Sequence, residues 1–222
     1  MIMNTSTVFV IDDQPSVRHA LCEMLSAFGY SVEAHESADG FLRVLDPLRH
    51  GCVVADVRMP GMDGIELVRE LARRQIPLPV VVISGHADVP MAVAAIKAGA
   101  EDFIEKPIDD VQLVAAINRG LAGVYAQRRF QERIQDLRTR FDRLTPREVE
   151  VLDLVVQGYT SEAIAERLEI STRTVEGYRV QIMNKMQAES VAVLVRQAIR
   201  LNLMSPSKYA PSVSHTKSSW PP

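Results

Sequence analysis

The fold is decided by the stretch Cys52–Gly64, which reads CVVADVRMPGMDG. Its first four residues, Cys52–Ala55, form a short apolar run of the kind that makes a buried β-strand. Asp56 follows this run directly, and a helical segment is predicted from Gly64 to Arg74. A buried strand that leads through an acidic residue into a helix is typical of one βα unit in a parallel sheet.

The same alternation continues on either side of this unit. Four further short runs are expected as strands: Val8–Ile11, Ser31–Ala34, Val80–Ile83 and Asp102–Ile104. The helical segments between them are Ser16–Phe28, Ala38–Leu45, Val89–Ala98 and one that begins at Asp109. In the first of these, apolar residues recur at three- and four-residue spacing: Val17, Leu21, Met24, Leu25 and Phe28. Five βα units in roughly 120 residues predict an α/β domain with a five-stranded parallel sheet, doubly wound and flavodoxin-like.

After Gly120 the strand-like runs stop, and the rest of the chain is predicted to be helical. Residues 124–143 are polar and rich in arginine, and we expect them to form a helical linker after a first domain of residues 1–123. Four short helices are then predicted: Pro146–Gln157, Ser161–Leu168, Thr172–Met186 and Ser190–Leu203. They make an all-α domain of residues 144–204. Residues 205–222 contain serine and proline without periodicity, and we expect them to be disordered.

The starts of these four helices carry capping signals. Thr145 precedes Pro146 and lies three residues before Glu148, an arrangement typical of an N-cap with proline at the first helical position. Three serines are predicted to cap the following helices: Ser161, Ser171 and Ser190.

The bulk properties are those of a soluble globular protein, with 47% hydrophobic and 24% charged residues. The two cysteines, Cys22 and Cys52, lack CxxC spacing, which argues against a metal or disulfide framework. The sequence shows neither a signal peptide nor an uninterrupted apolar run of about 18 residues, so we expect a cytoplasmic protein without a membrane span. The formal charge is −7 for residues 1–123 and +4 for residues 124–222, which suggests that the second half meets a polyanion.

Polar residues follow the predicted strands of the first half. Asp12-Asp13 come after the first strand, Asp56 after the third, Ser84 after the fourth, and Lys106-Pro107 after the fifth. Since ligands of parallel α/β folds bind at the carboxyl ends of the strands, we expect these side chains to converge at one edge.

Several carboxylates in one pocket repel one another unless a divalent cation lies between them. All-oxygen ligands favour Mg²⁺, which also binds phosphate oxygens. One carboxylate could then attack phosphorus and form an aspartyl phosphate, with Mg²⁺ and Lys106 neutralising the transferred group. The hydroxyl of Ser84 could hydrogen-bond that phosphate and move its own loop.

This set, with the stretch Asp56–Gly64, resembles the receiver domain of bacterial two-component response regulators over about Thr7 to Leu121. The resemblance implies that a partner sensor histidine kinase phosphorylates Asp56. It also implies that Mg²⁺ is held by Asp12, Asp13, Asp56 and the backbone carbonyl of Arg58. Lys106 would contact the phosphoryl group, and Phe103 would be the aromatic switch residue that follows Ser84. Family members often have threonine at the position of Ser84, which preserves the hydroxyl.

The segment Ser161–Met186 is predicted to form a helix-turn-helix motif. Its second helix has an apolar face of Val175, Tyr178, Ile182 and Met186 opposite a polar face. In such motifs the second helix enters the major groove of DNA, led by its N-terminal residues. The candidate contacts to phosphates and base edges are Thr160, Ser161, Arg173, Thr174, Glu176, Gly177, Arg179, Val180, Gln181 and Lys185.

The motifs of this half resemble the LuxR-type DNA-binding domain over about Leu144 to Leu201, notably Leu144–Glu148, Ile164-Ala165 and Ile170–Val175. With the receiver, they resemble the FixJ/NarL family, closest to the FixJ branch. The resemblance implies a transcriptional activator rather than an enzyme, which dimerises on phosphorylation and binds promoter DNA and RNA polymerase. Glu176 and Gly177 replace the basic and β-branched residues that are often found there, so base preference is not carried over.

Two other classes of function fit parts of the pattern. A Mg²⁺-dependent phosphatase or phosphotransfer protein would use the acidic pocket as an active site, and catalytic turnover of added substrates would reveal it. An adaptor without DNA output would use its C-terminal helices to bind another protein, and gel-shift assays with genomic fragments would separate it from a regulator.

Overall fold

The computed structural model describes residues 6–86, 88–201 and 203. The chain divides into two compact units, Met1–Arg128 and Arg129–Pro222. The tail of residues 205–222, predicted to be disordered, lies outside the described residues. Within the described part of the chain, no helix has both the length and the apolar character needed to cross a membrane.

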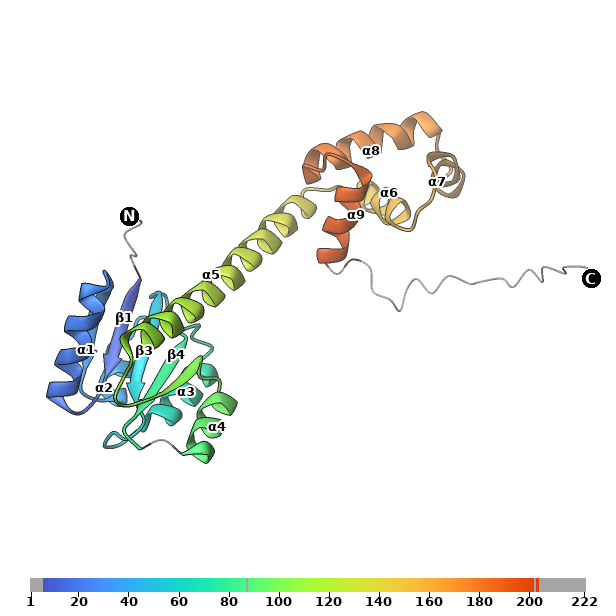
Figure 1. Ribbon diagram of the computed structural model, residues 1–222. Coiled ribbons are helices and arrows are strands. Elements are labelled where there is room, and N and C mark those ends of the chain that lie inside the picture. Colours follow the sequence, from blue (N-terminus) through green and yellow to red (C-terminus); the bar gives the residue numbers. More distant parts are fainter. Residues whose placement is uncertain (1–5, 87, 202, 204–222) are drawn as a thin grey trace, which may run out of the picture. The chain divides into compact units, whose positions relative to one another are not determined.

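The first unit contains a five-stranded sheet (Figure 1). Its strands are β1 (Thr7–Ile11), β2 (Ser31–His35), β3 (Gly51–Asp56), β4 (Val80–Ser84) and β5 (Asp102–Glu105). All neighbouring strands are parallel, in the order β2-β1-β3-β4-β5. The predicted parallel sheet is thus confirmed. Its three central strands are apolar because helices cover both of their faces.

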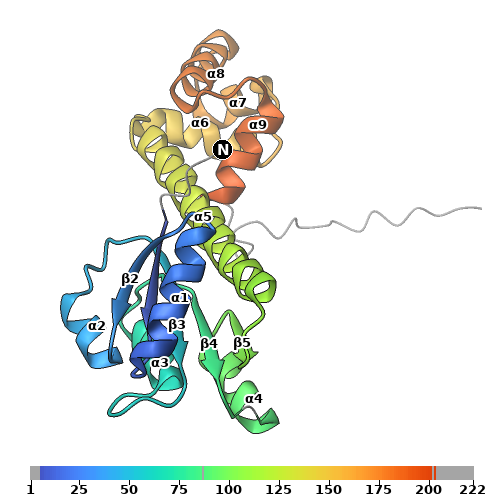
Figure 2. The same ribbon diagram turned by 60° about the vertical axis from the view of Figure 1, so that its left-hand side comes forward.

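Helices lie on both faces of this sheet (Figure 2). They are α1 (Pro15–Ala27), α2 (Ala38–Val44), α3 (Gly64–Arg73), α4 (Val89–Ala98) and α5 (Asp110–Phe141). Alternate strand residues feed two separate cores: Phe9 and Val53 pack with α2, α3 and α4, whereas Val8 and Val54 pack with α1 and the first turns of α5. This confirms the doubly wound arrangement. Phe28, predicted on the apolar face of α1, is instead 50% exposed because it follows the last helical residue.

Helix α5 runs without interruption from the first unit into the second. The segment predicted as a helical linker, residues 124–143, lies in this helix up to Phe141 and then in the turn before α6. Leu113, Ile117 and Leu121 of α5 are buried against the sheet, and Leu137 is buried in the core of the second unit.

The second unit contains four further helices around one apolar core. They are α6 (Pro146–Val156), α7 (Ser161–Leu168), α8 (Thr172–Met186) and α9 (Val191–Arg200). Thr145 and Glu148 form the predicted capping box of α6, and Ser171 and Ser190 cap α8 and α9. Ser161 was the predicted cap of α7, but Thr160 accepts the hydrogen bond from the Ala163 amide instead. Ser161 is already the first helical residue.

Candidate functional site

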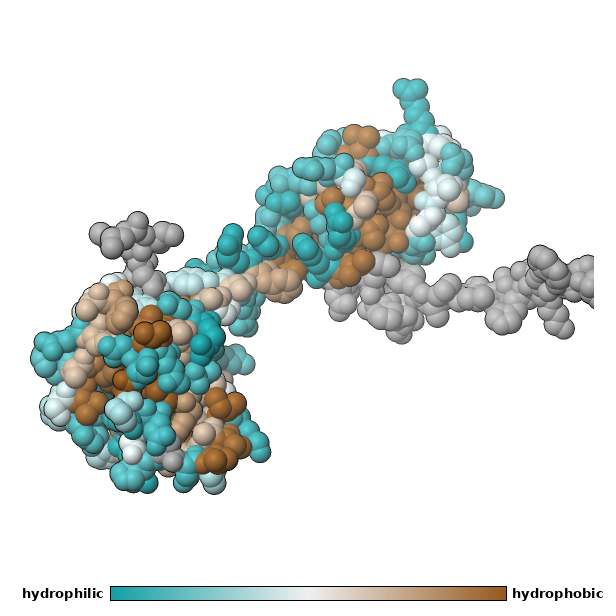
Figure 3. All heavy atoms as spheres, in the orientation of Figure 1, coloured by the Kyte–Doolittle hydropathy of each residue, from teal (hydrophilic) through white to brown (hydrophobic). Residues whose placement is uncertain are grey.

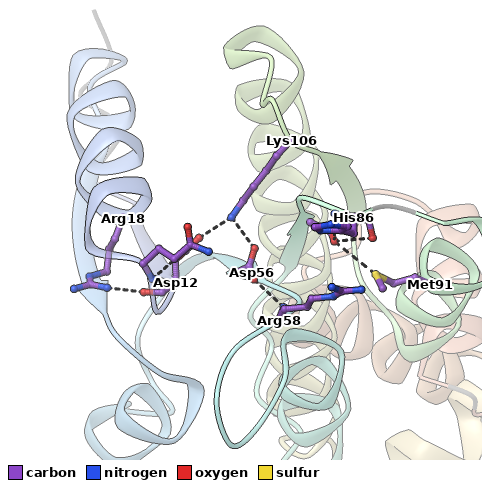
Figure 4. A network of polar contacts seen from close by, with 9 residues as sticks. Asp12, Arg18, Asp56, Arg58, His86, Met91 and Lys106 are labelled. Carbon is purple, nitrogen blue, oxygen red and sulfur yellow. Dashed lines mark hydrogen bonds and ion pairs between the residues drawn. The ribbon is translucent and has the colours of Figure 1, made fainter.

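The carboxyl ends of β1, β3 and β5 bring three charged side chains together (Figure 4). Lys106 Nζ donates a hydrogen bond of 2.7 Å to Asp56 Oδ1 and one of 2.9 Å to Asp12 Oδ2. Both aspartates are buried. Strand pairing causes this convergence, because β1 and β3 are neighbours and end at the same level, with Ile11 beside Ala55. Of the residues predicted to converge, the structure joins Asp12, Asp56 and Lys106 by hydrogen bonds, whereas Ser84 is hydrogen-bonded to His86.

Backbone groups fix the orientation of the two carboxylates. The Arg58 amide donates to Asp56 Oδ2 at 2.8 Å, and the Gln14 amide donates to Asp12 Oδ1 at 2.9 Å. Asp56 thus accepts from a donor on each of its oxygens. Since carboxylates accept charge-assisted hydrogen bonds strongly, these two bonds orient the Asp56 carboxylate.

Two opposing effects act on the pKa of Lys106. Burial favours the neutral amine, but the hydrogen bonds and charges of Asp56 and Asp12 outweigh it and raise the pKa above its ordinary value. The ammonium is therefore charged at all physiological pH values and partly neutralises two buried carboxylates.

Asp13 directly follows Asp12 in the loop after β1. Its Oδ1 is buried and, within the described residues, accepts no hydrogen bond. A buried carboxylate oxygen without a donor is costly, and a cation would remove that cost. No group of three acidic, histidine or cysteine side chains in the described chain is yet arranged to hold a metal. The donor set fits Mg²⁺ once the Lys106 ammonium releases at least one of its two carboxylates.

Ser84 lies at the end of β4, where its hydroxyl is engaged by the loop that follows. It accepts from the His86 amide at 3.2 Å and lies 3.2 Å from the His86 carbonyl and 3.6 Å from Met91 Sδ. A hydroxyl that turned toward a phosphate on Asp56 would give up these bonds, which tie β4 to α4. Phe103 on β5 is half-buried and packs against the core beneath α4.

Gly64 has a role that sequence reasoning did not assign. A Cβ atom on this residue would lie 2.3 Å from the backbone oxygen of Asp56, far inside contact distance. Its amide donates to the Val57 carbonyl at 3.1 Å, which closes the loop after β3. Only glycine lets α3 start this close to the strand that carries Asp56. The sequence signal for this role is a glycine at the first position of a predicted helix, where a close approach of the backbone requires it.

Helices α7 and α8 form the predicted helix-turn-helix. Val175, Ile182 and Met186 are buried, and Tyr178 is half-buried, as predicted for the apolar face of α8. The exposed candidate DNA contacts are Thr160, Arg173, Thr174, Glu176, Gly177, Val180 and Gln181, whereas Arg179 and Lys185 are half-buried. The polar face of α8 is thus open at its N-terminal end.

Three of the candidate contacts bind inside the domain. Ser161 is buried, and its hydroxyl donates to the Glu176 carboxylate, which joins the start of α7 to α8. Lys185 Nζ donates to Glu148 Oε2 at 2.7 Å, and Glu148 is 4% exposed. The first contact joins α7 to α8, and the second joins α8 to α6.

The fold and pocket define a class of protein: a receiver joined to a helix-turn-helix output, as in two-component response regulators. The sequence of residues 8–118 matches the response regulator receiver domain family. The sequence of residues 142–198 matches the bacterial regulatory proteins of the luxR family. Transcriptional regulatory protein FixJ of Rhizobium meliloti is 45% identical over 89% of this chain and 97% of its own. Response regulator protein TodT of Pseudomonas putida is 40% identical over 88% of this chain and 86% of its own.

Solved structures agree with these similarities. Response regulator StyR matches with a TM-score of 0.78 at 41% identity, over 88% of this chain and 99% of that chain. Full-length FixJ from B. japonicum matches with a TM-score of 0.57 at 40% identity, over 90% of this chain and 98% of that chain. The chain belongs to the FixJ/NarL family of response regulators, which carry a LuxR-type DNA-binding domain. It is a phosphorylation-dependent regulator of transcription, and its relatives are regulators rather than enzymes.

Proposed function

We propose that a sensor histidine kinase phosphorylates Asp56 and that the chain then dimerises and activates transcription from promoter DNA. The observation that carries this proposal is the buried carboxylate of Asp56, whose Oδ1 accepts a hydrogen bond of 2.7 Å from the Lys106 ammonium. One of its oxygens would attack phosphorus and form an acyl phosphate, while the P–N bond of the kinase phosphohistidine breaks and the histidine imidazole leaves, taking up a proton.

Receiver domains generally bind Mg²⁺ at the phosphorylation site, where it neutralises the charge of the transferred group. In this chain Asp12, Asp13, Asp56 and the Arg58 carbonyl would hold it, which the orphaned Asp13 oxygen supports. Lys106 would then contact the phosphoryl oxygens. Its raised pKa keeps it charged for this role.

The proposed relay starts at Ser84. A phosphate on Asp56 offers the Ser84 hydroxyl a charged acceptor. This acceptor competes with the backbone carbonyl of His86 and with Met91 Sδ. Movement of this loop would alter the surface of α4 and β5, including Phe103. On α4, Val89 is 77% exposed and Ile96 is 51% exposed, and apolar side chains gather over this helix at the lower right edge of the first unit in Figure 3. Such a surface supports dimerisation through α4.

In the second unit, the open face of α8 supports entry into the major groove. Arg173 and Gln181 are exposed there and can pair with guanine and adenine edges, while Val180 can contact a thymine methyl group. Thr160, Thr174 and Arg179 would contact phosphates. We propose weaker roles for Ser161, Glu176 and Lys185, since they already bind within the domain. The chain would act in the cytoplasm, where it would contact RNA polymerase at the promoter.

The test is an Asp56→Asn variant, compared with the parent protein and with Asp39→Asn, which removes an exposed acid on α2. With acetyl phosphate and Mg²⁺, the parent and Asp39→Asn should become dimeric in sedimentation and bind promoter fragments more tightly. Asp56→Asn should do neither, because its amide cannot accept the phosphoryl group. If Asp56→Asn dimerised and bound promoters as the parent does, the proposal would be wrong.

A further inference from the structure

The second unit contains a basic groove that has no role in the proposed phosphorylation of Asp56 or in the proposed contacts with DNA bases. It has a volume of about 560 Å³ and lies between the C-terminal part of α5 and helix α9. Its lining contains three arginines, one acidic residue, one glutamine and an apolar floor of two residues: Arg133, Arg196, Arg200, Asp136, Gln197, Leu137 and Val193. We call these residues the α5–α9 groove.

The charge of the α5–α9 groove is unbalanced. Asp136 is already paired with Arg140 at 2.5 Å. Arg133, Arg196 and Arg200 are exposed, and no ion pair or hydrogen bond joins them to any other described residue. Guanidinium groups gathered on one groove repel one another, and planar, bidentate carboxylates are the ligands that suit them best. The groove is therefore complementary to an anionic ligand.

The position of the groove argues against DNA as that ligand. Gln197 in the groove donates to the carbonyl of Met186, the last residue of α8, and Arg140 reaches the same carbonyl at 3.4 Å. Helix α8 has 15 residues. It is therefore about 22 Å long, and recognition helices read DNA from their N-terminal end. The groove thus lies at the opposite end of the recognition helix.

The shape of the groove favours a peptide over a single phosphate ion. From Val193 to Arg200 the helix α9 advances about 10 Å, which is the length of about three residues of an extended chain. The floor of Leu137 and Val193 is apolar, and Leu137 is 7% exposed. An extended peptide can place carboxylates on the arginines and an aliphatic side chain on this floor. A lone phosphate can do only the first.

We propose that the α5–α9 groove binds an acidic peptide segment of a protein partner, one that carries aspartates or glutamates beside an aliphatic residue. This interaction is separate from DNA binding and does not require phosphorylation of Asp56. It gives the DNA-bound regulator a surface for a second macromolecule on the side away from the bases.

The experiment uses the full chain and a fluorescein-labelled pentapeptide in which a central leucine has two aspartates on each side. Fluorescence anisotropy at near-physiological salt should show saturable binding, and the same peptide with asparagines should not bind. The double variant Arg196→Gln/Arg200→Gln should weaken peptide binding by roughly tenfold, about threefold for each lost charge pair. Its affinity for promoter DNA should stay within about twofold of the parent, because this groove is remote from the reading end of α8.

The matched control is Arg173→Gln, on the open face of α8, which should weaken DNA binding and leave peptide binding unchanged. Circular dichroism of both variants checks that these exposed substitutions leave the fold intact. Two results would overturn the inference. In one, the double variant loses DNA affinity as much as peptide affinity, which would assign the groove to DNA phosphates. In the other, the aspartate peptide binds no better than the asparagine peptide, or binds the double variant as well as the parent.

Discussion

At the scale of single residues, the pocket depends on how closely α3 approaches the strand that ends at Asp56. The Gly64→Ala substitution would place a Cβ 2.3 Å from the Asp56 backbone oxygen, so the loop between them must shift. We expect a loss of about 1–3 kcal/mol in the free energy of unfolding, as for other overpacked sites. The shift would also move Asp56 relative to Lys106, so phosphorylation by acetyl phosphate should slow. Urea unfolding and phosphate incorporation measure the two effects.

Gly123 serves as the control for this prediction, since a Cβ there would meet no atom within 4 Å. Gly123→Ala should therefore leave phosphate incorporation unchanged and should not destabilise α5. Equal rates of incorporation in Gly64→Ala and the parent would contradict the proposed role of Gly64.

The same residues mark what the sequence could predict. Asp12, Asp56 and Lys106 were predictable because each follows an apolar run, and parallel strands bring such ends together. The Asp13 oxygen without a donor and the contact of Gly64 with the Asp56 backbone were not predictable. They depend on rotamers and on atomic spacing between elements, which periodicity does not encode.

At the scale of elements, helix α8 contains a glycine that is exposed on its reading face. A Cβ on Gly177 would meet no described atom within 4 Å. Gly177→Ala should therefore stabilise the free protein by up to about 1 kcal/mol, because alanine is the better helix former. If the helix approaches DNA closely at this point, the added methyl group should weaken promoter binding. Thermal unfolding and gel-shift titration give the two values, and unchanged or tighter DNA binding would contradict close approach.

The sequence placed this helix correctly but did not predict the contacts that two of its polar residues make inside the domain. Lys185 and Glu176 stand on or beside the polar face by helical spacing, and helical spacing cannot distinguish a side chain that reaches DNA from one that binds a neighbouring helix. Glu148, 37 positions before Lys185 in the chain, and Ser161 at the start of α7 are partners that only the tertiary fold supplies.

The ion pair of Glu148 and Lys185 predicts a pH dependence for the DNA-binding domain. Burial tends to raise the pKa of Glu148, but Lys185 and the Thr145 hydrogen bonds outweigh it and lower the pKa below its ordinary value of 4.5. A carboxylate with a lowered folded pKa stabilises the fold above its unfolded pKa, and this stability is lost as the pH falls through the folded value. The stabilisation should thus be complete at pH 7 and decline below about pH 4.5.

The variant Glu148→Gln tests this dependence. It leaves the Lys185 ammonium without its carboxylate, so it should cost about 1–3 kcal/mol at pH 7, somewhat less than breaking a fully buried pair. The difference from the parent should shrink as the pH is lowered below 4.5, where the parent also loses the charge. Urea unfolding over a pH series measures it. A difference that did not change with pH would show that packing, rather than charge, stabilises this contact.

At the scale of the whole molecule, phosphorylation of one unit must alter the behaviour of the other. The chain joins an acidic receiver of residues 1–123, with a formal charge of −7, to a second half with a charge of +4. Dimerisation can join their functions without any specific signal along α5, because two linked DNA-binding domains bind adjacent half-sites at high effective concentration. The order of the two domains was predictable from the sequence. The apolar surface that would join two copies was not, since Val93 and Ile96 follow the same spacing as core residues.

The Ile96→Asp substitution tests this coupling, because it places a charge on the exposed apolar surface of α4, where Ile96 is 51% exposed. Phosphate incorporation at Asp56 should continue at the parent rate, but the phosphorylated variant should remain monomeric in sedimentation. Its affinity for a single half-site should equal that of the parent, and its affinity for a paired site should fall by roughly tenfold to a hundredfold as the gain from effective concentration is lost. Val44→Asp, which charges a 69% exposed apolar residue on α2, is the matched control and should dimerise normally. A phosphorylated Ile96→Asp protein that still dimerised would exclude α4 from the interface, whereas a monomer that kept full affinity for the paired site would disconnect dimerisation from DNA binding.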